Sequence, residues 1–213
     1  MSLTFYFAPM STASISNAVI TELGLECERI ELSIRKGETR TPEFLAINPN
    51  GRVPVIVHDG TVIWESVAIT LYLGETFGVE AGLYPPPGPR RGEAMKWITW
   101  STVTLGGAAG RLAESTPDAD GSVEPGSKDW VEPDERVRAV ESKARADINV
   151  CLSILNDAMA GKPYLLGDFS LVDAHLFGFI WWLNLMSVDL GPFANVTAWL
   201  ERCGKRPALS DSD

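Results

Sequence analysis

The chain has 213 residues, of which 45% are hydrophobic, enough to bury a substantial core in one large domain or two small ones. Its 18 basic and 28 acidic residues give a formal net charge of −10, which argues against nucleic acid or another phosphate-rich partner. No eighteen apolar residues run together and the first residues lack a signal-peptide pattern, so we expect no membrane span and a cytoplasmic protein.

The first 78 residues alternate between strand and helix patterns. Pro and Gly mark the ends of several elements, and Asp59-Gly60 is typical of a two-residue hairpin. The expected elements are a strand over residues 3–8, a helix ending at Gly24, a strand over 27–32, a helix over 42–47, hairpin strands over 53–57 and 61–64, and a helix from Glu65. The order βαβαββα indicates a thioredoxin-like α/β domain.

Pro54 interrupts the strand expected over residues 53–57, because proline cannot donate a hydrogen bond to a strand ladder. We expect a cis Val53–Pro54 peptide bond that aims the main-chain N–H and C=O of Val53 at an extended ligand. Glu65 and Ser66 then stand at a helix start, where a hydroxyl and free N–H groups can bind an anion. The spacing predicts a site for a short peptide with a free α-carboxylate.

Beyond residue 78 the strand signals end. Residues 79–90 contain Pro85-Pro86-Pro87-Gly88-Pro89 and form the expected linker between a domain of residues 1–78 and a helical domain of residues 91–213. The expected elements of the second domain are a helix over 93–114 loosened at Gly106-Gly107, a polar loop over 115–133, an amphipathic helix over 134–159, a helix through 186 that starts at the capping box Ser170–Asp173, and a short helix over 195–203.

Asn-Pro-x-Gly-x-Val-Pro at residues 48–54, followed by Glu-Ser and Val-Ala-Ile-x-x-Tyr-Leu at residues 65–73, resembles the N-terminal domain of cytosolic glutathione S-transferases, nearest to the bacterial beta and theta patterns. The resemblance covers nearly the whole chain, more by pattern after residue 78. It implies the glutathione S-transferase fold, glutathione as co-substrate, and a homodimer.

The same resemblance assigns residues to glutathione. Val53 and Pro54 would bind the cysteinyl backbone, and Glu65 and Ser66 the γ-glutamyl group. Three cations are further candidates for the peptide, although each could equally be a solvated surface charge: Arg35, Lys36 and Arg52.

A thiol with a pKa of about 8.5 is mostly protonated at neutral pH, so the protein must stabilise the thiolate. Ser11 and Thr12, in the loop after the first strand, are the catalytic candidates, and Ser14 is the third. Helix capping is the alternative for Ser11 and Thr12. Tyr6 is a rival that strand alternation could equally bury. Thr12 stands where the beta-class pattern has a cysteine, which disfavours mixed-disulfide chemistry.

The beta class also uses a histidine near the position of Gly106. Without it we expect an open wall, with Trp100, Thr104 and Arg111 lining an acceptor pocket between the domains; the alternative for Trp100 is helix core.

The predicted function is transfer of glutathione, held as thiolate, to a hydrophobic electrophile, as in detoxification. A glutathione-dependent isomerase or dehalogenase would share the peptide site, and a non-catalytic binding or regulatory protein would share the fold. No metal site is expected, because three scattered cysteines and two histidines, His58 and His175, form no ligand pattern and the histidines are expected to be structural.

Overall fold

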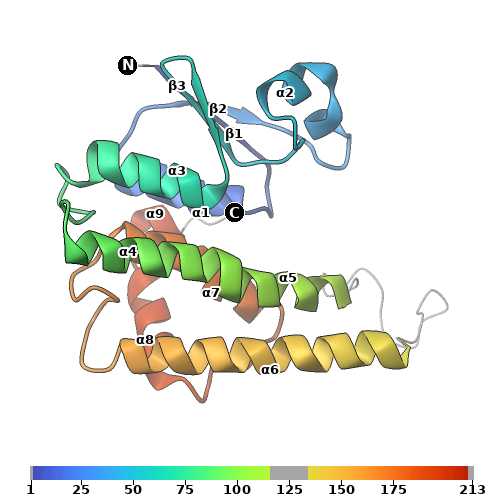
Figure 1. The fold of residues 1–213 in the computed structure, drawn as a ribbon, viewed down its shortest axis with the longest axis vertical. Helices are drawn as coiled ribbons and strands as arrows, with labels where there is room; N and C mark the ends of the chain where they lie inside the picture. The colour runs from blue at the N-terminus through green and yellow to red at the C-terminus, as the bar shows by residue number, and fades with distance from the viewer. Residues whose placement is uncertain (1, 116–133, 211–213) are drawn as a thin grey trace.

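The computed structural model describes residues 2–115 and 134–210. Figure 1 shows two lobes, one built on a small sheet and one made of helices that lie side by side below it. The order of the first lobe is βαβαββα, as the sequence predicts. Its elements are β1 (Leu3–Phe7), α1 (Ala13–Glu22), β2 (Glu28–Glu31), α2 (Pro42–Ile47), β3 (Val55–His58), β4 (Thr61–Trp64) and α3 (Ser66–Leu73).

The sheet has the strand order β2–β1–β3–β4, with β1 and β2 parallel and the other two pairings antiparallel. Because side chains alternate along a strand, the two faces of β1 meet different helices. Phe5 is fully buried, on the face toward α1 and α3, whereas Tyr6 contacts Phe44 of α2, with 5.8 Å between ring centroids. The sheet therefore separates α2 from the helices that face the second lobe (Figure 1).

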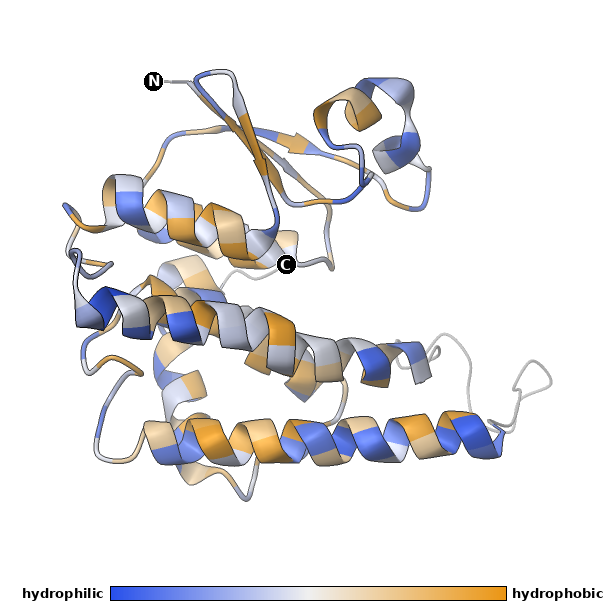
Figure 2. Cartoon of the chain, viewed as in Figure 1, coloured by the Kyte–Doolittle hydropathy of each residue, from blue (hydrophilic) through white to orange (hydrophobic). Residues whose placement is uncertain are grey.

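The regular elements in the described part of the second lobe are helices, joined by loops. The π-helical turn η2 (Gly74–Gly78) extends α3, and α4 begins at Pro89, inside the segment predicted as the linker. Figure 2 shows apolar and polar residues alternating along α6, as expected for an amphipathic helix. The helices are α4 (Pro89–Trp100), the π-helical turn η3 (Ser101–Leu105), α5 (Gly106–Ser115), α6 (Glu135–Ala158), α7 (Leu171–Leu185), α8 (Ala194–Cys203) and α9 (Pro207–Ser210).

The helix predicted over residues 93–114 is irregular, but not at the predicted place. The π-helical turn occupies Ser101–Leu105, and Gly106 and Gly107 begin a regular helix, α5. Glycine at position 106 instead allows α5 to approach α7 closely, because a Cβ there would lie 2.7 Å from Cε1 of Phe179. The loop predicted over 115–133 lies outside the described residues, apart from Ser115, which ends α5.

The capping box at the start of α7 is present, as predicted. Oδ2 of Asp173 accepts hydrogen bonds from the main-chain N–H of Ser170 at 3.0 Å and from its hydroxyl at 3.1 Å. Oδ1 accepts from the N–H of Leu165 at 3.1 Å and from Nε1 of Trp199 at 2.9 Å. Asp173 is fully buried, so one carboxylate holds the start of α7, the preceding loop and α8 together.

Three contacts fix the lobes to each other. His175 of α7 is hydrogen-bonded through Nδ1 to Thr70 of α3 at 2.8 Å and through Nε2 to Thr102 of η3 at 3.1 Å. Gly178 of α7 lies against Ile15 of α1, where an added Cβ would be 2.8 Å from Cγ1 of Ile15. Arg206, just before α9, makes a two-pronged ion pair with Glu22 at the end of α1, with both N···O distances 2.7 Å. None of the described helices is long and apolar enough to cross a membrane.

Candidate functional site

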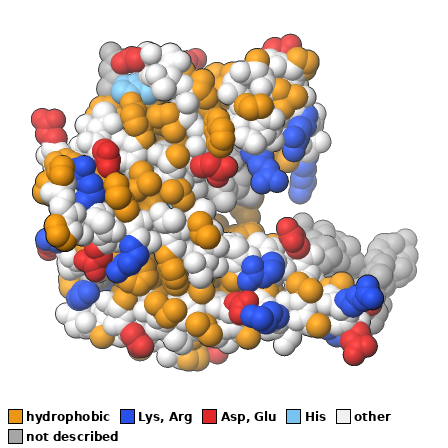
Figure 3. Space-filling view, viewed as in Figure 1, with side chains coloured by type: hydrophobic (Ala, Val, Ile, Leu, Met, Phe, Trp, Pro, Cys, Tyr) orange, Lys and Arg blue, Asp and Glu red, His pale blue; other side chains and the backbone are white. Residues whose placement is uncertain are grey.

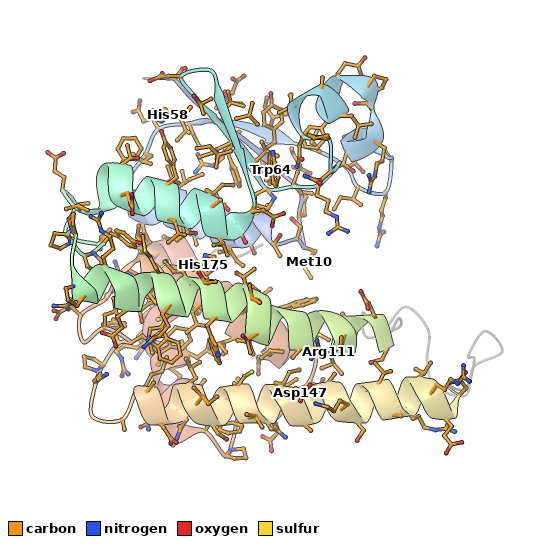
Figure 4. The ribbon with its side chains drawn as sticks, viewed as in Figure 1. Met10, His58, Trp64, Arg111, Asp147 and His175 are labelled. Carbon is orange, nitrogen blue, oxygen red and sulfur yellow. The ribbon has the colours of Figure 1, made fainter. Side chains whose placement is uncertain are left out.

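One edge of the sheet gathers the predicted peptide-binding segments. The register pairs Tyr6 with Val55 and Val55 with Trp64, so the end of β1, the start of β3 and the end of β4 lie next to one another. The chain continues from that edge into the loop before α1, the Val53–Pro54 turn and the Glu65–Ser66 helix start. Residues far apart in the sequence are thereby brought to the side of the sheet that faces the helical lobe (Figures 1 and 4).

The Val53–Pro54 peptide bond is cis, as the sequence predicts. The amide of Asn48 donates a 2.7 Å hydrogen bond to the carbonyl of Arg52 and holds the turn from behind. Within residues 2–115 and 134–210, the main-chain N–H and C=O of Val53 have no hydrogen-bond partner. A main-chain pair of this kind can bond an extended ligand as a strand would.

The first turn of α3 is open. The N–H groups of Ser66, Val67 and Ala68 have no partner in the described part of the chain, and neither has the hydroxyl of Ser66. Ser66 is only 4% exposed, and Glu65 before it has φ 75° and ψ 124°, a conformation that residues with a side chain rarely adopt. Unpaired N–H groups and the positive end of the helix dipole favour an anion here.

The four candidate hydroxyls differ in what they already bind. Ser11 donates to the carbonyl of Ala8 at 2.7 Å and accepts from the N–H of Ala13 at 3.2 Å, and Ser14 donates to the carbonyl of Ser11 at 3.0 Å. Thr12 is exposed, and its hydroxyl has no partner among the described residues.

Tyr6, the fourth hydroxyl, lies on the α2 side of the sheet. Since the others donate elsewhere or face away, Thr12 at the start of α1 is the hydroxyl that is free to donate to a thiolate.

The candidate cations are on the surface of the first lobe. Arg35, Lys36 and Arg52 are exposed, and none makes an ion pair with another described residue. Figure 3 shows a notch between the lobes, with basic side chains at the rim of the overhanging upper lobe. Cations at such a rim are available to a ligand carboxylate and are weakly held when it is absent.

A cavity of about 340 Å³ opens beside the hydroxyl-rich loop, between α1 and the helices α5 and α7. Met10 is 71% exposed and projects from the upper lobe toward α5 (Figure 4). No lining side chain carries a charge, and three of them are aromatic rings of α7. The lining residues are Met10, Ser11, Thr12, Ser14, Ile15, Gly106, Gly110, Gly178, Phe179, Trp181 and Trp182.

The residues predicted for the acceptor pocket do not line this cavity. Trp100 packs edge-on against Trp97 with 5.3 Å between centroids, and Thr104 is exposed on η3. Arg111 points to Asp147 of α6 instead, with 3.1 Å between Nη2 and Oδ2 (Figure 4). The prediction of an open wall near Gly106 does agree with the cavity, because both Gly106 and Gly110 line it.

The aromatic wall on α7 is the part of the cavity that the sequence reasoning missed. Gly178, Trp181 and Trp182 recur at helical spacing, which places them on one face of α7. That spacing was available as a signal, but α7 is apolar on all sides, so the sequence does not tell which of its faces borders a cavity.

No group of three or more potential metal ligands gathers within the described ranges. Nδ1 of His58 lies 2.6 Å from the hydroxyl of Tyr72. Burial lowers the pKa of His175 to about 3, so its ring is neutral at physiological pH. The two histidines hold side chains in place and face neither the cavity nor the peptide-binding edge.

Comparison with known proteins identifies two family models in the chain. The N-terminal domain model of glutathione S-transferase matches residues 1–75, and the C-terminal domain model matches residues 122–207. Glutathione S-transferase GstB of Escherichia coli K12 is 29% identical over 209 residues, which cover 93% of this chain and 92% of that protein.

Solved structures agree in fold. A glutathione transferase from Methylococcus capsulatus is 26% identical with a TM-score of 0.80, and the match covers 99% of this chain and 96% of that one. A glutathione transferase homologue from Sulfitobacter, solved with bound glutathione, has a TM-score of 0.79 at 23% identity, with 98% and 95% covered. At 23% identity, the similarity to the Sulfitobacter structure shows the fold alone.

Proposed function

The chain belongs to the glutathione S-transferase family, and from this premise we propose that it binds glutathione, holds it as the thiolate and directs the sulfur at an uncharged, apolar electrophile. One observation carries the proposal: in the described part of the chain, main-chain groups at the sheet edge and the start of α3 have no partner, and they lie directly beside an apolar cavity lined by an unpaired hydroxyl. Buried polar groups are normally paired, so a row of open ones is most simply explained by a ligand that pairs them.

In the proposed complex, the cysteinyl main chain of glutathione bonds the N–H and C=O of Val53. The γ-glutamyl carboxylate binds the first turn of α3 and the hydroxyl of Ser66, and the exposed carboxylate of Glu65 faces the ammonium group of the same residue. The glycyl carboxylate is left for exposed cations of the first lobe, of which Lys36 and Arg52 are the candidates. Each charged group of the tripeptide thus lies opposite a group of opposite charge or partial charge.

The thiol then lies at the start of α1, where Thr12 donates its hydroxyl hydrogen to the sulfur. A hydrogen bond to an anion contributes about 1.5 to 3 kcal/mol, and a helix start adds up to about 1 kcal/mol. Together these suffice to lower the pKa of the thiol by about two units, which requires roughly 2.7 kcal/mol. The thiolate attacks an electrophilic carbon of the acceptor in the cavity and forms a carbon–sulfur bond. In a substitution, the leaving group departs with the electron pair of the broken bond. In an addition, the anion that results on the acceptor is protonated.

Two measurements test this function. Calorimetric titration with glutathione reports binding, and the ultraviolet absorbance of the thiolate, followed against pH, reports activation. The Thr12→Ala variant is expected to keep the glutathione affinity within about threefold and to raise the pKa of the bound thiol by one to two units, whereas Thr12→Ser restores it. Ser11→Ala is the matched control, since the hydroxyl of Ser11 already donates to Ala8.

The outcomes separate the proposals. A bound thiol that titrates as in free solution in the unmodified protein would favour the second candidate, a non-catalytic glutathione-binding protein. Activation that disappears in Ser11→Ala and survives in Thr12→Ala would move the catalytic role to Ser11. A cytoplasmic homodimer remains part of the proposal, and light scattering tests the dimer directly.

A further inference from the structure

Two of the three glycines in the cavity wall are explained by packing. A Cβ on Gly106 would lie 2.7 Å from Phe179, and a Cβ on Gly178 would lie 2.8 Å from Ile15. Both distances are shorter than non-bonded carbon atoms tolerate, so α5 and α1 approach α7 as closely as they do only because these side chains are absent.

Gly110 has no such explanation. Among residues 2–115 and 134–210, no atom beyond the adjoining backbone of its own helix lies within 4 Å of the position that its Cβ would occupy, and its φ is not positive. A glycine inside a helix costs about 1 kcal/mol relative to alanine, so neither packing nor backbone conformation favours glycine here. Gly110 stands one turn after Gly106 on α5 and lines the same cavity, so a side chain at 110 would enter the space that the glycine leaves open.

We infer that Gly110 sets the size limit of the acceptor, and that the preferred acceptors are uncharged electrophiles with a fused two-ring aromatic body. This inference rests on the proposed function. A cavity of about 150 Å³ accommodates benzene, and the cavity beside Thr12 has about 340 Å³. The volume therefore suits two rings better than one.

The lining determines the charge and shape of the acceptor. Phe179, Trp181 and Trp182 offer ring faces and edges to a flat aromatic body. Because none of the lining side chains is charged, an ionised group on the acceptor would lose its hydration without gaining a partner.

Glutathione conjugates provide the test, because they carry peptide and acceptor in one molecule. The dissociation constants of glutathione, S-methylglutathione, S-benzylglutathione and S-(2-naphthylmethyl)glutathione are measured by calorimetry. Affinity is expected to rise roughly tenfold with each added ring, from the apolar surface buried. S-(4-carboxybenzyl)glutathione is expected to bind at least tenfold more weakly than the benzyl conjugate.

The Gly110→Leu variant is expected to weaken the naphthylmethyl conjugate at least tenfold and to leave glutathione and S-methylglutathione within twofold. Gly92→Leu is the matched control, since Gly92 is an exposed glycine within helix α4 and its Cβ position also has no described atom within 4 Å beyond its own helix backbone. Equal affinities across the series, or equal losses for all ligands in Gly110→Leu, would overturn the inference while leaving the proposed function intact. A protein that binds no glutathione at all would refute the proposed function itself.

Discussion

Helix α3 begins at Ser66 and helix α7 follows Ser170, but the N–H groups at the two helix starts differ in how they are paired. At α7, Ser170 has an extended backbone with φ −148°, and the Asp173 carboxylate accepts four hydrogen bonds from its surroundings. At α3, Glu65 has φ 75°, no side chain caps the helix, and three N–H groups are left without a partner within the described ranges. The two helices touch through the hydrogen bond between Thr70 and His175.

The difference distinguishes a helix start that serves the fold from one that is open to the proposed ligand. A helix start whose donors are mostly paired within the protein, as at α7, contributes to stability and has little left for a ligand. A helix start with open donors and a strained residue lowers the stability of the free protein and gains partners only in a complex. Substitutions at α7 should therefore lower stability and leave glutathione binding unchanged, and substitutions at α3 should weaken glutathione binding without a comparable loss of stability.

Removing the carboxylate at α7 is expected to have the largest effect. Asp173→Ala leaves four buried donors without an acceptor, at about 1 to 3 kcal/mol each before water enters, so we expect a loss of about 4 kcal/mol in the free energy of unfolding. Urea denaturation measures it. Asp168→Ala, in the adjacent loop with a 97% exposed side chain, is the control and should change little.

If Asp173→Ala does not fold, Asp173→Asn keeps one acceptor oxygen and should retain the glutathione affinity of the unmodified protein. A loss of less than about 1 kcal/mol in Asp173→Ala would show that the buried carboxylate is not the structural centre of α7.

The reciprocal change at α3 is Ser66→Ala. It removes one hydroxyl hydrogen bond to the ligand carboxylate, so we expect glutathione to bind roughly 30-fold more weakly, about 2 kcal/mol, with the stability of the free protein changed by less than about 1 kcal/mol. Ser170→Ala is the mirror control: it should lower stability by about 1 kcal/mol and leave the dissociation constant unchanged. If both serines affected both measurements equally, the distinction between the two helix starts would fail.

The contact between α3 and α7 makes stability depend on pH. Burial lowers the pKa of His175 to about 3, below its ordinary value of about 6.5, so between these values the unfolded chain binds a proton that the folded chain does not. Stability contributed by the neutral ring is therefore complete above pH 6.5 and falls as the pH drops, by about 1.4 kcal/mol at pH 5.5. The urea concentration at the midpoint of unfolding, plotted against pH, should lose its slope in His175→Gln and keep it in His58→Gln.

The smallest expected effect is at the strained residue. Glu65→Gly relieves a conformation that costs about 1 to 3 kcal/mol but adds backbone entropy to the unfolded chain, so the net gain in stability should be about 1 kcal/mol. Glutathione binding should weaken, because the carboxylate proposed to face the ligand ammonium is removed. A stability loss would mean that the side chain of Glu65, and not the ligand, maintains this backbone geometry.

The fold could be read from local signals because those signals were strong. The cis Val53–Pro54 bond, the Asp59-Gly60 hairpin and the Ser170–Asp173 capping box each depend on neighbouring residues, and each appears in the structure where expected. The strand predicted over residues 53–57 begins only at Val55, because Pro54 precedes the strand and does not lie within it. The irregular segment in the first helix of the second lobe lies at Ser101–Leu105, a few residues before the predicted Gly106-Gly107. Glycine weakens a helix but also allows close packing, and the sequence does not tell which of these applies at Gly106. The contact with Phe179 shows that it is close packing.

The polar side of the candidate site could be proposed from the sequence, and its apolar side less so. Val53, Pro54 and Ser66 follow from a motif within twenty residues of sequence. The choice among Ser11, Thr12 and Ser14 depends on which carbonyl each hydroxyl reaches, and this follows from the loop geometry. The cavity wall depends on which face of α7 meets α1 and α5, a property of helix packing that a uniformly apolar sequence does not encode.

The ion pair between Arg206 and Glu22 links positions 184 residues apart, close to the two ends of the chain. Helix α1, which follows the proposed thiolate hydroxyl of Thr12, is covered by α7 and held at its last turn by Arg206. Neither partner of this ion pair lines the cavity. Cutting the link would nevertheless loosen the helix whose first turn the proposed chemistry depends on.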